Sequence, residues 1–106
     1  MSIPEISVQE LAALQKSGKD LLILDVRNPD EYAICNIGGL LIPANEVSAR
    51  LQELNPDKHT IIHCHGGGRS RRVTEFLINH GFKRVFNLKG GITAWAKEID
   101  PTMPTY

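Results

Sequence analysis

The stretch Ile61-Ile62-His63-Cys64-His65-Gly66-Gly67-Gly68-Arg69-Ser70-Arg71-Arg72-Val73 decides the fold. It begins as an apolar strand, passes through a cysteine and three consecutive glycines, and restarts as a basic segment that we expect to be helical. Because glycines carry no side chain, such a loop can turn its backbone N–H groups inward and form a concave site for negative charge. The following helix adds unpaired N–H groups and the positive end of its dipole. The stretch therefore predicts a strand–loop–helix turn that favours an anion.

Cys64 stands at the start of this loop. A thiol beside inward-facing N–H groups and a helix N-terminus ionises more readily than a free cysteine, whose pKa is about 8.5. The thiolate is the nucleophilic form, so we predict that Cys64 is an activated sulfur nucleophile. An inert, buried cysteine and a flexible glycine turn are the alternatives. A phosphate-binding P-loop is disfavoured, because Arg69-Ser70 stands where that motif carries Lys followed by Ser or Thr.

Composition and cysteine usage narrow the classes of function. With 106 residues, we expect one domain over residues 1–106, large enough for a core without metal or disulfide support. The formal net charge is zero, which predicts no nucleic-acid partner and no membrane partner. The two cysteines, Cys35 and Cys64, make neither a disulfide framework nor a Cys-x-x-Cys pair. We therefore expect no metal site and no cofactor.

The N-terminus and the apolar runs bear on localisation. Residues 1–5 lack the basic region followed by an apolar run that marks a signal peptide. No apolar stretch approaches the ~18 residues needed to span a membrane. With so few cysteines, these features predict a protein of the reducing cytoplasm.

Segments typical of strands and helices alternate along the chain. Strands are predicted at residues 3–6, 20–26, 40–42, 60–63 and 84–88, and helices at 7–18, 28–35, 45–54, 69–80 and 92–99. The alternation and the short links predict an α/β fold with a central, mostly parallel five-stranded sheet and helices on both faces. Ligands of such sheets bind beyond the carboxyl ends of the strands. The Cys64 loop and the turn from Asp25 to Arg27 should therefore share one edge.

Several motifs follow one another in an order typical of a known family. They are Leu24-Asp25-Val26-Arg27-Asn28-Pro29-Asp30-Glu31-Tyr32, then Ile42-Pro43, then the loop from Cys64 to Ser70, then Asn87-Leu88-Lys89-Gly90-Gly91-Ile92 with Ala94-Trp95. On these residues the chain resembles a single rhodanese domain, the sulfurtransferase module, over nearly its whole length. The stretch 32–37 and the ending 100–106 are most similar to rhodanese domains fused to activating enzymes of the MoeB/ThiF kind.

The resemblance implies a rhodanese-like fold and a double displacement at Cys64. The Cys64 thiolate would take a sulfane sulfur from a donor such as thiosulfate or a low-molecular-weight persulfide, and pass it to a thiol acceptor or to cyanide. A sulfur-carrier protein or a cysteine desulfurase would be a suitable partner. Asp25 and Arg27 would brace the site, and the guanidinium fork of Arg69 would suit an oxyanion donor. The persulfide would be held by the N–H groups of His65, Gly66, Gly67, Gly68, Arg69 and Ser70.

Loop length separates two kinds of chemistry within this resemblance. Four residues lie between Cys64 and Arg69. In the related Cdc25-type phosphatases this loop is one residue longer and makes room for a phosphate, so the shorter loop favours sulfur transfer over phosphate or arsenate chemistry. A non-catalytic binding domain is the third reading. Retention of both Cys64 and Arg69 argues against it, whereas a buried, un-ionised Cys64 would favour it.

Three positions depart from the family pattern or leave a choice open. Cys35-Asn36 stands where the family commonly has Gly-His, and His65 stands where many active members carry arginine or lysine. The donor therefore stays open between thiosulfate, a carrier protein and a small persulfide. His65 is a candidate for substrate contact. Cys35 is a resolving thiol or, as we favour, a small buried helix residue.

Overall fold

Five short strands form the centre of the structure, a computed structural model that describes residues 3–106. All neighbouring strands are parallel, in the order β1-β5-β4-β2-β3. The strands are β1 (Glu5–Ile6), β2 (Leu22–Asp25), β3 (Leu40–Leu41), β4 (Thr60–His63) and β5 (Val85–Leu88). The helices are α1 (Val8–Lys16), α2 (Pro29–Ile34), α3 (Gly68–Asn79) and α4 (Gly91–Glu98), with the 3₁₀ helices η1 (Ala44–Glu46) and η2 (Ser48–Glu53). The predicted α/β fold is confirmed.

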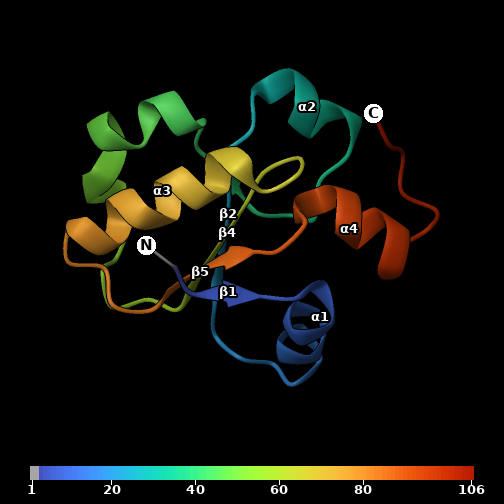
Figure 1. Ribbon diagram of the computed structural model, residues 1–106, viewed down its shortest axis with the longest axis horizontal. Coiled ribbons are helices and arrows are strands. Elements are labelled where there is room, and N and C mark those ends of the chain that lie inside the picture. The colour runs from blue at the N-terminus through green and yellow to red at the C-terminus, as the bar shows by residue number, and fades with distance from the viewer. Residues whose placement is uncertain (1–2) are drawn as a thin grey trace.

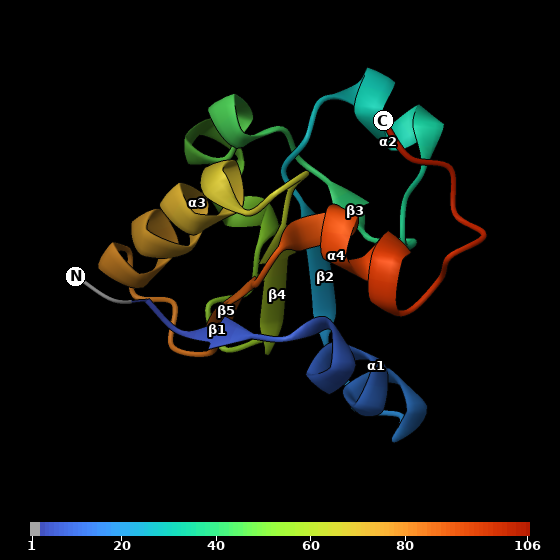
Figure 2. The same ribbon diagram turned by 45° about the vertical axis from the view of Figure 1, so that its right-hand side comes forward.

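Helices cover both faces of the sheet (Figures 1 and 2). On one face, Val73 and Leu77 of α3 belong to the buried cluster that contains Ile62 of β4. On the other face, Leu11 of α1 packs in the cluster that contains Ile61 of the same strand. Successive side chains of a strand point to opposite faces, so adjacent isoleucines of β4 serve two separate cores. This explains why the central strand is continuously apolar.

The carboxyl ends of three strands lead into the helices that build one edge of the molecule. Strand β2 ends at Asp25 before α2, β4 ends at His63 before α3, and β5 ends at Leu88 before α4. Because all of these strands are parallel, the three connections meet at the same edge. The predicted meeting of the Asp25 turn and the Cys64 loop follows from this topology.

The prediction of one continuous helix at residues 45–54 is wrong in the type of helix. The chain forms η1 and η2 instead, and Arg50 interrupts η2 with φ −116° and ψ 22°. The amide of Glu46 donates to the Pro43 carbonyl at 2.8 Å, three residues back, as a 3₁₀ turn requires. The apolar residues Val47 and Leu54 of this segment are buried. Over two turns, the spacing of such residues identifies the inward face of a helix but does not distinguish 3.6 from 3.0 residues per turn.

The α-helices begin where the sequence predicts. Ser7 and Glu10 form a capping box at the start of α1. Ser7 Oγ accepts from the Glu10 amide at 3.1 Å, and Glu10 Oε1 accepts from the Ser7 amide at 3.0 Å. The longest helix described, α3, has 12 residues. No helix within residues 3–106 has the length and apolar character that a membrane crossing needs.

Candidate active site

The loop after β4 turns the chain directly into α3. Cys64 follows the last strand residue, and Gly67 caps α3 with φ 114°, a left-handed conformation that favours glycine. A Cβ atom added at Gly66 or Gly68 would meet no atom within 4 Å. Of the three loop glycines, Gly67 is therefore the one that the backbone conformation requires.

Three donor groups lie within hydrogen-bonding distance of the sulfur of Cys64. The Gly67 amide lies 3.1 Å from Sγ, the Ser70 amide lies at 3.5 Å, and the Ser70 hydroxyl lies at 3.4 Å. The first turn of α3 also points its positive dipole end toward this sulfur. Such donors stabilise a sulfur anion more than a neutral thiol. Of the loop residues from His65 to Ser70 predicted to donate, the structure brings the amides of Gly67 and Ser70 to the sulfur of Cys64.

Ser70 is fully buried and links Cys64 to β5. Its hydroxyl lies 2.5 Å from Asn87 Oδ1 and 3.2 Å from the Gly67 carbonyl, in addition to the contact with sulfur. Asn87 is 2% exposed, and its amide nitrogen donates to Glu5 at 3.0 Å. One hydroxyl hydrogen serves one acceptor at a time, so Asn87, the Gly67 carbonyl and the sulfur compete for the Ser70 proton. Sequence reasoning gave Asn87 no role at the site; the signal was a polar residue within an apolar strand.

The start of α4 holds the first two residues of the loop. The amides of Ile92 and Thr93 donate to the carbonyls of Cys64 at 2.9 Å and His65 at 3.1 Å. Gly91 lies beneath these carbonyls with φ 60°, and a Cβ there would be 2.5 Å from the His65 oxygen and 2.6 Å from the Cys64 oxygen. Any side chain at this position would therefore displace the loop.

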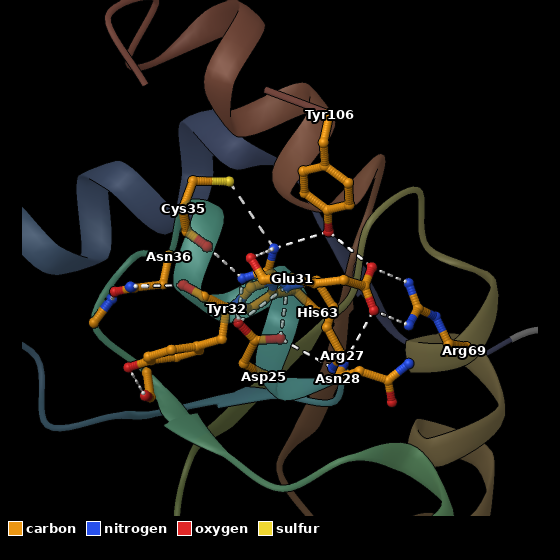
Figure 3. Close-up of polar contacts among 12 residues, drawn as sticks. Asp25, Arg27, Asn28, Glu31, Tyr32, Cys35, Asn36, His63, Arg69 and Tyr106 are labelled. Atoms are coloured by element: carbon orange, nitrogen blue, oxygen red, sulfur yellow. Dashed lines mark hydrogen bonds and ion pairs between the residues drawn. The ribbon is translucent and has the colours of Figure 1, made fainter. Parts of the chain in front are cut away.

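Asp25 and Arg27 form a buried ion pair at the end of β2 (Figure 3). Both side chains are 0% exposed, and Arg27 Nη2 lies 2.7 Å from Asp25 Oδ2 while Nε lies 2.9 Å from Oδ1. Arg27 also donates to the Cys35 carbonyl at 2.7 Å, which ties the end of α2 to the sheet. The charge of Arg27 is therefore balanced by the Asp25 carboxylate within the protein. That this pair braces the site stays a prediction.

Arg69 forms the second ion pair, with Glu31 of α2 (Figure 3). The contact is bidentate, with Nη1 2.6 Å from Oε1 and Nη2 2.9 Å from Oε2. The guanidinium hydrogen bonded to Glu31 holds the pKa of that carboxyl down at about 2. The fork that the sequence analysis assigns to an oxyanion donor is thus occupied. Glu31 was named only as part of the family motif, and a partner 38 positions away leaves no local signal.

Tyr106 lies over both ion pairs. Its hydroxyl accepts from Arg27 Nη1 at 2.9 Å and donates to Glu31 Oε2 at 2.9 Å. Burial raises the pKa of Tyr106, so the hydroxyl keeps its proton near neutrality. The ring stacks on His65 with centroids 4.3 Å apart, and His65 Nε2 lies 3.0 Å from the Tyr106 main-chain oxygen. The imidazole of His65 is thus held by Tyr106, and sequence reasoning assigned Tyr106 no place in the site.

His63 and Cys35 lie beneath this polar layer. Neither ring nitrogen of the buried His63 has a hydrogen-bond partner within residues 3–106, and Nε2 lies 3.6 Å from Asp25 Oδ2. Burial lowers the pKa of His63, which therefore stays neutral at physiological pH. Cys35 is 8% exposed, ends α2, and lies 4.0 Å from Arg27 Nη1. This fits the small buried residue that we favour over a resolving thiol.

Cys64 is 1% exposed and joins the core cluster beneath α3. Burial is the feature that would favour a non-catalytic domain. The donor groups around the sulfur favour a reactive thiol instead, because an inert core cysteine is usually surrounded by apolar groups.

A family model for the Rhodanese-like domain matches residues 7–98. The chain belongs to the rhodanese-like family. This rhodanese-like domain is 34% identical over 96 residues to a sulfurtransferase of Allochromatium vinosum, covering 90% of each chain. It is 36% identical over 104 residues to the probable adenylyltransferase/sulfurtransferase MoeZ of Mycobacterium tuberculosis, covering 95% of this chain and 26% of MoeZ.

The structural comparison agrees with the sequence comparison. A crystal structure of a rhodanese-like domain protein from Staphylococcus aureus superposes with a TM-score of 0.83 and 32% identity, covering 92% of this chain and 95% of that one. Among the first relatives, the chain spans from 26% to 90% of their own length. The family and its sulfurtransferase members support a sulfurtransferase activity for this rhodanese-like domain.

Proposed function

We propose that this rhodanese-like domain moves a sulfane sulfur from a donor to a thiol acceptor, or to cyanide in an assay, through a persulfide on Cys64. The observation that carries the proposal is the set of donors from Gly67 and Ser70 directed at Sγ. They stabilise the attacking thiolate and then the negative charge of the persulfide, as oxyanion-hole donors do.

The chemistry takes two displacements. The Cys64 thiolate attacks the outer sulfur of the donor, the sulfur–sulfur bond of the donor breaks, and its electron pair leaves on sulfite (from thiosulfate) or on a thiolate (from a persulfide). The acceptor thiolate then attacks the terminal sulfur of the Cys64 persulfide. The new persulfide leaves on the acceptor, and Cys64 returns as a thiolate. A sulfur-carrier protein as acceptor and a cysteine desulfurase as donor fit this scheme.

Intact-mass spectrometry tests the proposal. The protein is incubated in parallel with thiosulfate, with glutathione persulfide, and with a cysteine desulfurase plus cysteine. We expect a mass increase of one sulfur atom that an acceptor thiol removes, and that Cys64→Ser abolishes. Cys35→Ser is the matched control, because it removes the other thiol and should still form the adduct. Absence of an adduct with every donor, or an adduct that persists in Cys64→Ser, would contradict the proposal.

A further inference from the structure

Two arginines at this edge of the sheet are each paired with a carboxylate. Arg27 is neutralised by Asp25 and Arg69 by Glu31, each through bidentate contacts. His63 adds no charge, because burial lowers its pKa. An anionic donor that approaches Cys64 therefore finds backbone N–H groups but no free guanidinium fork at the inner side of the loop.

Glu31 is held firmly in this place. Besides the two contacts with Arg69, its carboxylate accepts from the Asn28 amide at 3.0 Å and from the Tyr106 hydroxyl at 2.9 Å. The Glu31 side chain is 14% exposed, against 36% for Arg69. The carboxylate thus occupies, from within the protein, the planar position that a sulfonate-like oxyanion would take on the guanidinium.

Arg69 directly precedes Ser70, whose amide and hydroxyl lie 3.5 and 3.4 Å from Cys64 Sγ. The pKa of Arg69 is raised by its hydrogen bonds with Glu31. Arg71 and Lys89 line a separate hollow of about 270 Å³ together with the three loop glycines and Glu5, and Arg72 lines another hollow with Arg69. Arg71 is itself 3.6 Å from the Glu5 carboxylate.

We propose that Glu31 sets the donor class of the site: by filling the Arg69 fork, it disfavours oxyanion donors such as thiosulfate and leaves thiol persulfides as the preferred donors. This inference rests on the proposed sulfur transfer. Thiosulfate brings two negative charges and must expel sulfite, so it depends on an unpaired cation. A persulfide R–S–SH transfers its outer sulfur to the Cys64 thiolate, and the bond electrons and proton leave with R–SH. That reaction requires no fork.

Neutralising Glu31 tests the inference. Glutamine keeps the size of the side chain and can still accept from the Asn28 amide, but leaves Arg69 with an unbalanced charge. For Glu31→Gln we expect the rate constant of persulfide formation at low donor concentration to rise about tenfold with thiosulfate, which corresponds to one charge-assisted hydrogen bond gained by the donor. With glutathione persulfide we expect little change. Damage to the fold would lower both rates, so it cannot imitate this result.

Two matched variants complete the experiment. Arg71→Gln removes a loop-proximal cation outside the pair and should leave the ratio of the two donor rates unchanged. The double variant Glu31→Gln/Arg69→Gln should lose the gain with thiosulfate. A wild-type protein that loads faster from thiosulfate than from the persulfide, or an unchanged ratio in Glu31→Gln, overturns this inference alone. Failure of every donor to load Cys64 overturns the proposed function, and this inference with it.

Discussion

Two arginine–carboxylate pairs stand at the same edge of the sheet and share the same bidentate chemistry, yet they differ in burial. Asp25 and Arg27 are 0% exposed, whereas Glu31 and Arg69 are 14% and 36% exposed. A buried pair has lost its hydration and is stabilised only by its own contacts. A partly exposed pair can exchange a partner for water or for an anion at small cost. The buried pair therefore maintains the architecture, whereas the partly exposed pair is the one whose partner can be exchanged.

The pairs also differ in what they join. Asp25 and Arg27 are two residues apart, and Arg27 reaches the Cys35 carbonyl at the end of α2. Glu31 and Arg69 connect α2 to α3, which begins within the Cys64 loop. The first pair therefore fixes the end of a strand. The second fixes the helix that supplies hydrogen-bond donors to the nucleophile.

Breaking the buried pair should give the largest effect. Asp25→Asn leaves the charge of Arg27 uncompensated in the interior, and we expect the free energy of unfolding to fall by about 3–5 kcal/mol. Urea denaturation of the wild type and the variant measures the difference. Glu31→Gln is the matched control at the exposed pair, and should cost no more than about 1 kcal/mol. Equal losses in the two variants would contradict the distinction between the pairs.

The sequence predicts well what local pattern determines. The strand at residues 60–63, the helix after Ser7 and the turn from strand to helix through the three glycines all depend on near neighbours in the chain. Parallel topology then follows, because short links between strands and helices permit few arrangements. The segment 45–54 shows the limit. Its apolar spacing identifies the buried face, but the type of helix depended on backbone contacts that the spacing does not encode.

The site was predictable only in part, for a similar reason. The positions of Cys64, Ser70 and Arg69 follow from one loop. The residues that complete the site are distant in sequence: Asn87 is 17 positions from Ser70, and Tyr106 is 75 positions from Glu31. A single sequence contains no signal for such a pairing. This changes the chemistry expected of Arg69, because the sequence leaves its guanidinium without a partner whereas the structure pairs it with Glu31.

Burial beside the Asp25–Arg27 pair also disfavours a positive charge on His63, so we expect the stability of the fold to depend on pH. Burial lowers the pKa of His63, so below its usual value of 6.5 the unfolded chain binds a proton that the folded protein does not. The contribution of His63 to the free energy of unfolding is therefore fully present above pH 6.5. It falls as the pH drops below 6.5, by at most ~1.4 kcal/mol per pH unit.

Urea denaturation between pH 7.5 and pH 5.5 measures this slope. His63→Leu removes the titrating ring and should flatten it, since the ring makes no hydrogen bond within residues 3–106 that leucine would lose. His80→Gln replaces an exposed histidine and is the control for the substitution of a histidine as such. A slope that is the same in His63→Leu as in the wild type would contradict the assignment.

The smallest effect is expected where the two pairs meet. The Tyr106 hydroxyl bridges Arg27 and Glu31, and Tyr106→Phe removes this bridge while keeping the ring that stacks on His65. We expect the free energy of unfolding to fall by about 1 kcal/mol, because the lost hydrogen bonds involve charged groups but Tyr106 is 43% exposed. Tyr32→Phe is the matched control, since it loses one hydrogen bond to the neutral Gly39 carbonyl. Its loss should be the smaller of the two.

If Tyr106 couples the pairs, the cost of Tyr106→Phe should shrink in a Glu31→Gln background, because the acceptor charge is already gone. Strictly additive losses would mean that the buried and the exposed pair act independently, and that the donor side of the site can change without any effect on the pair that fixes the strand.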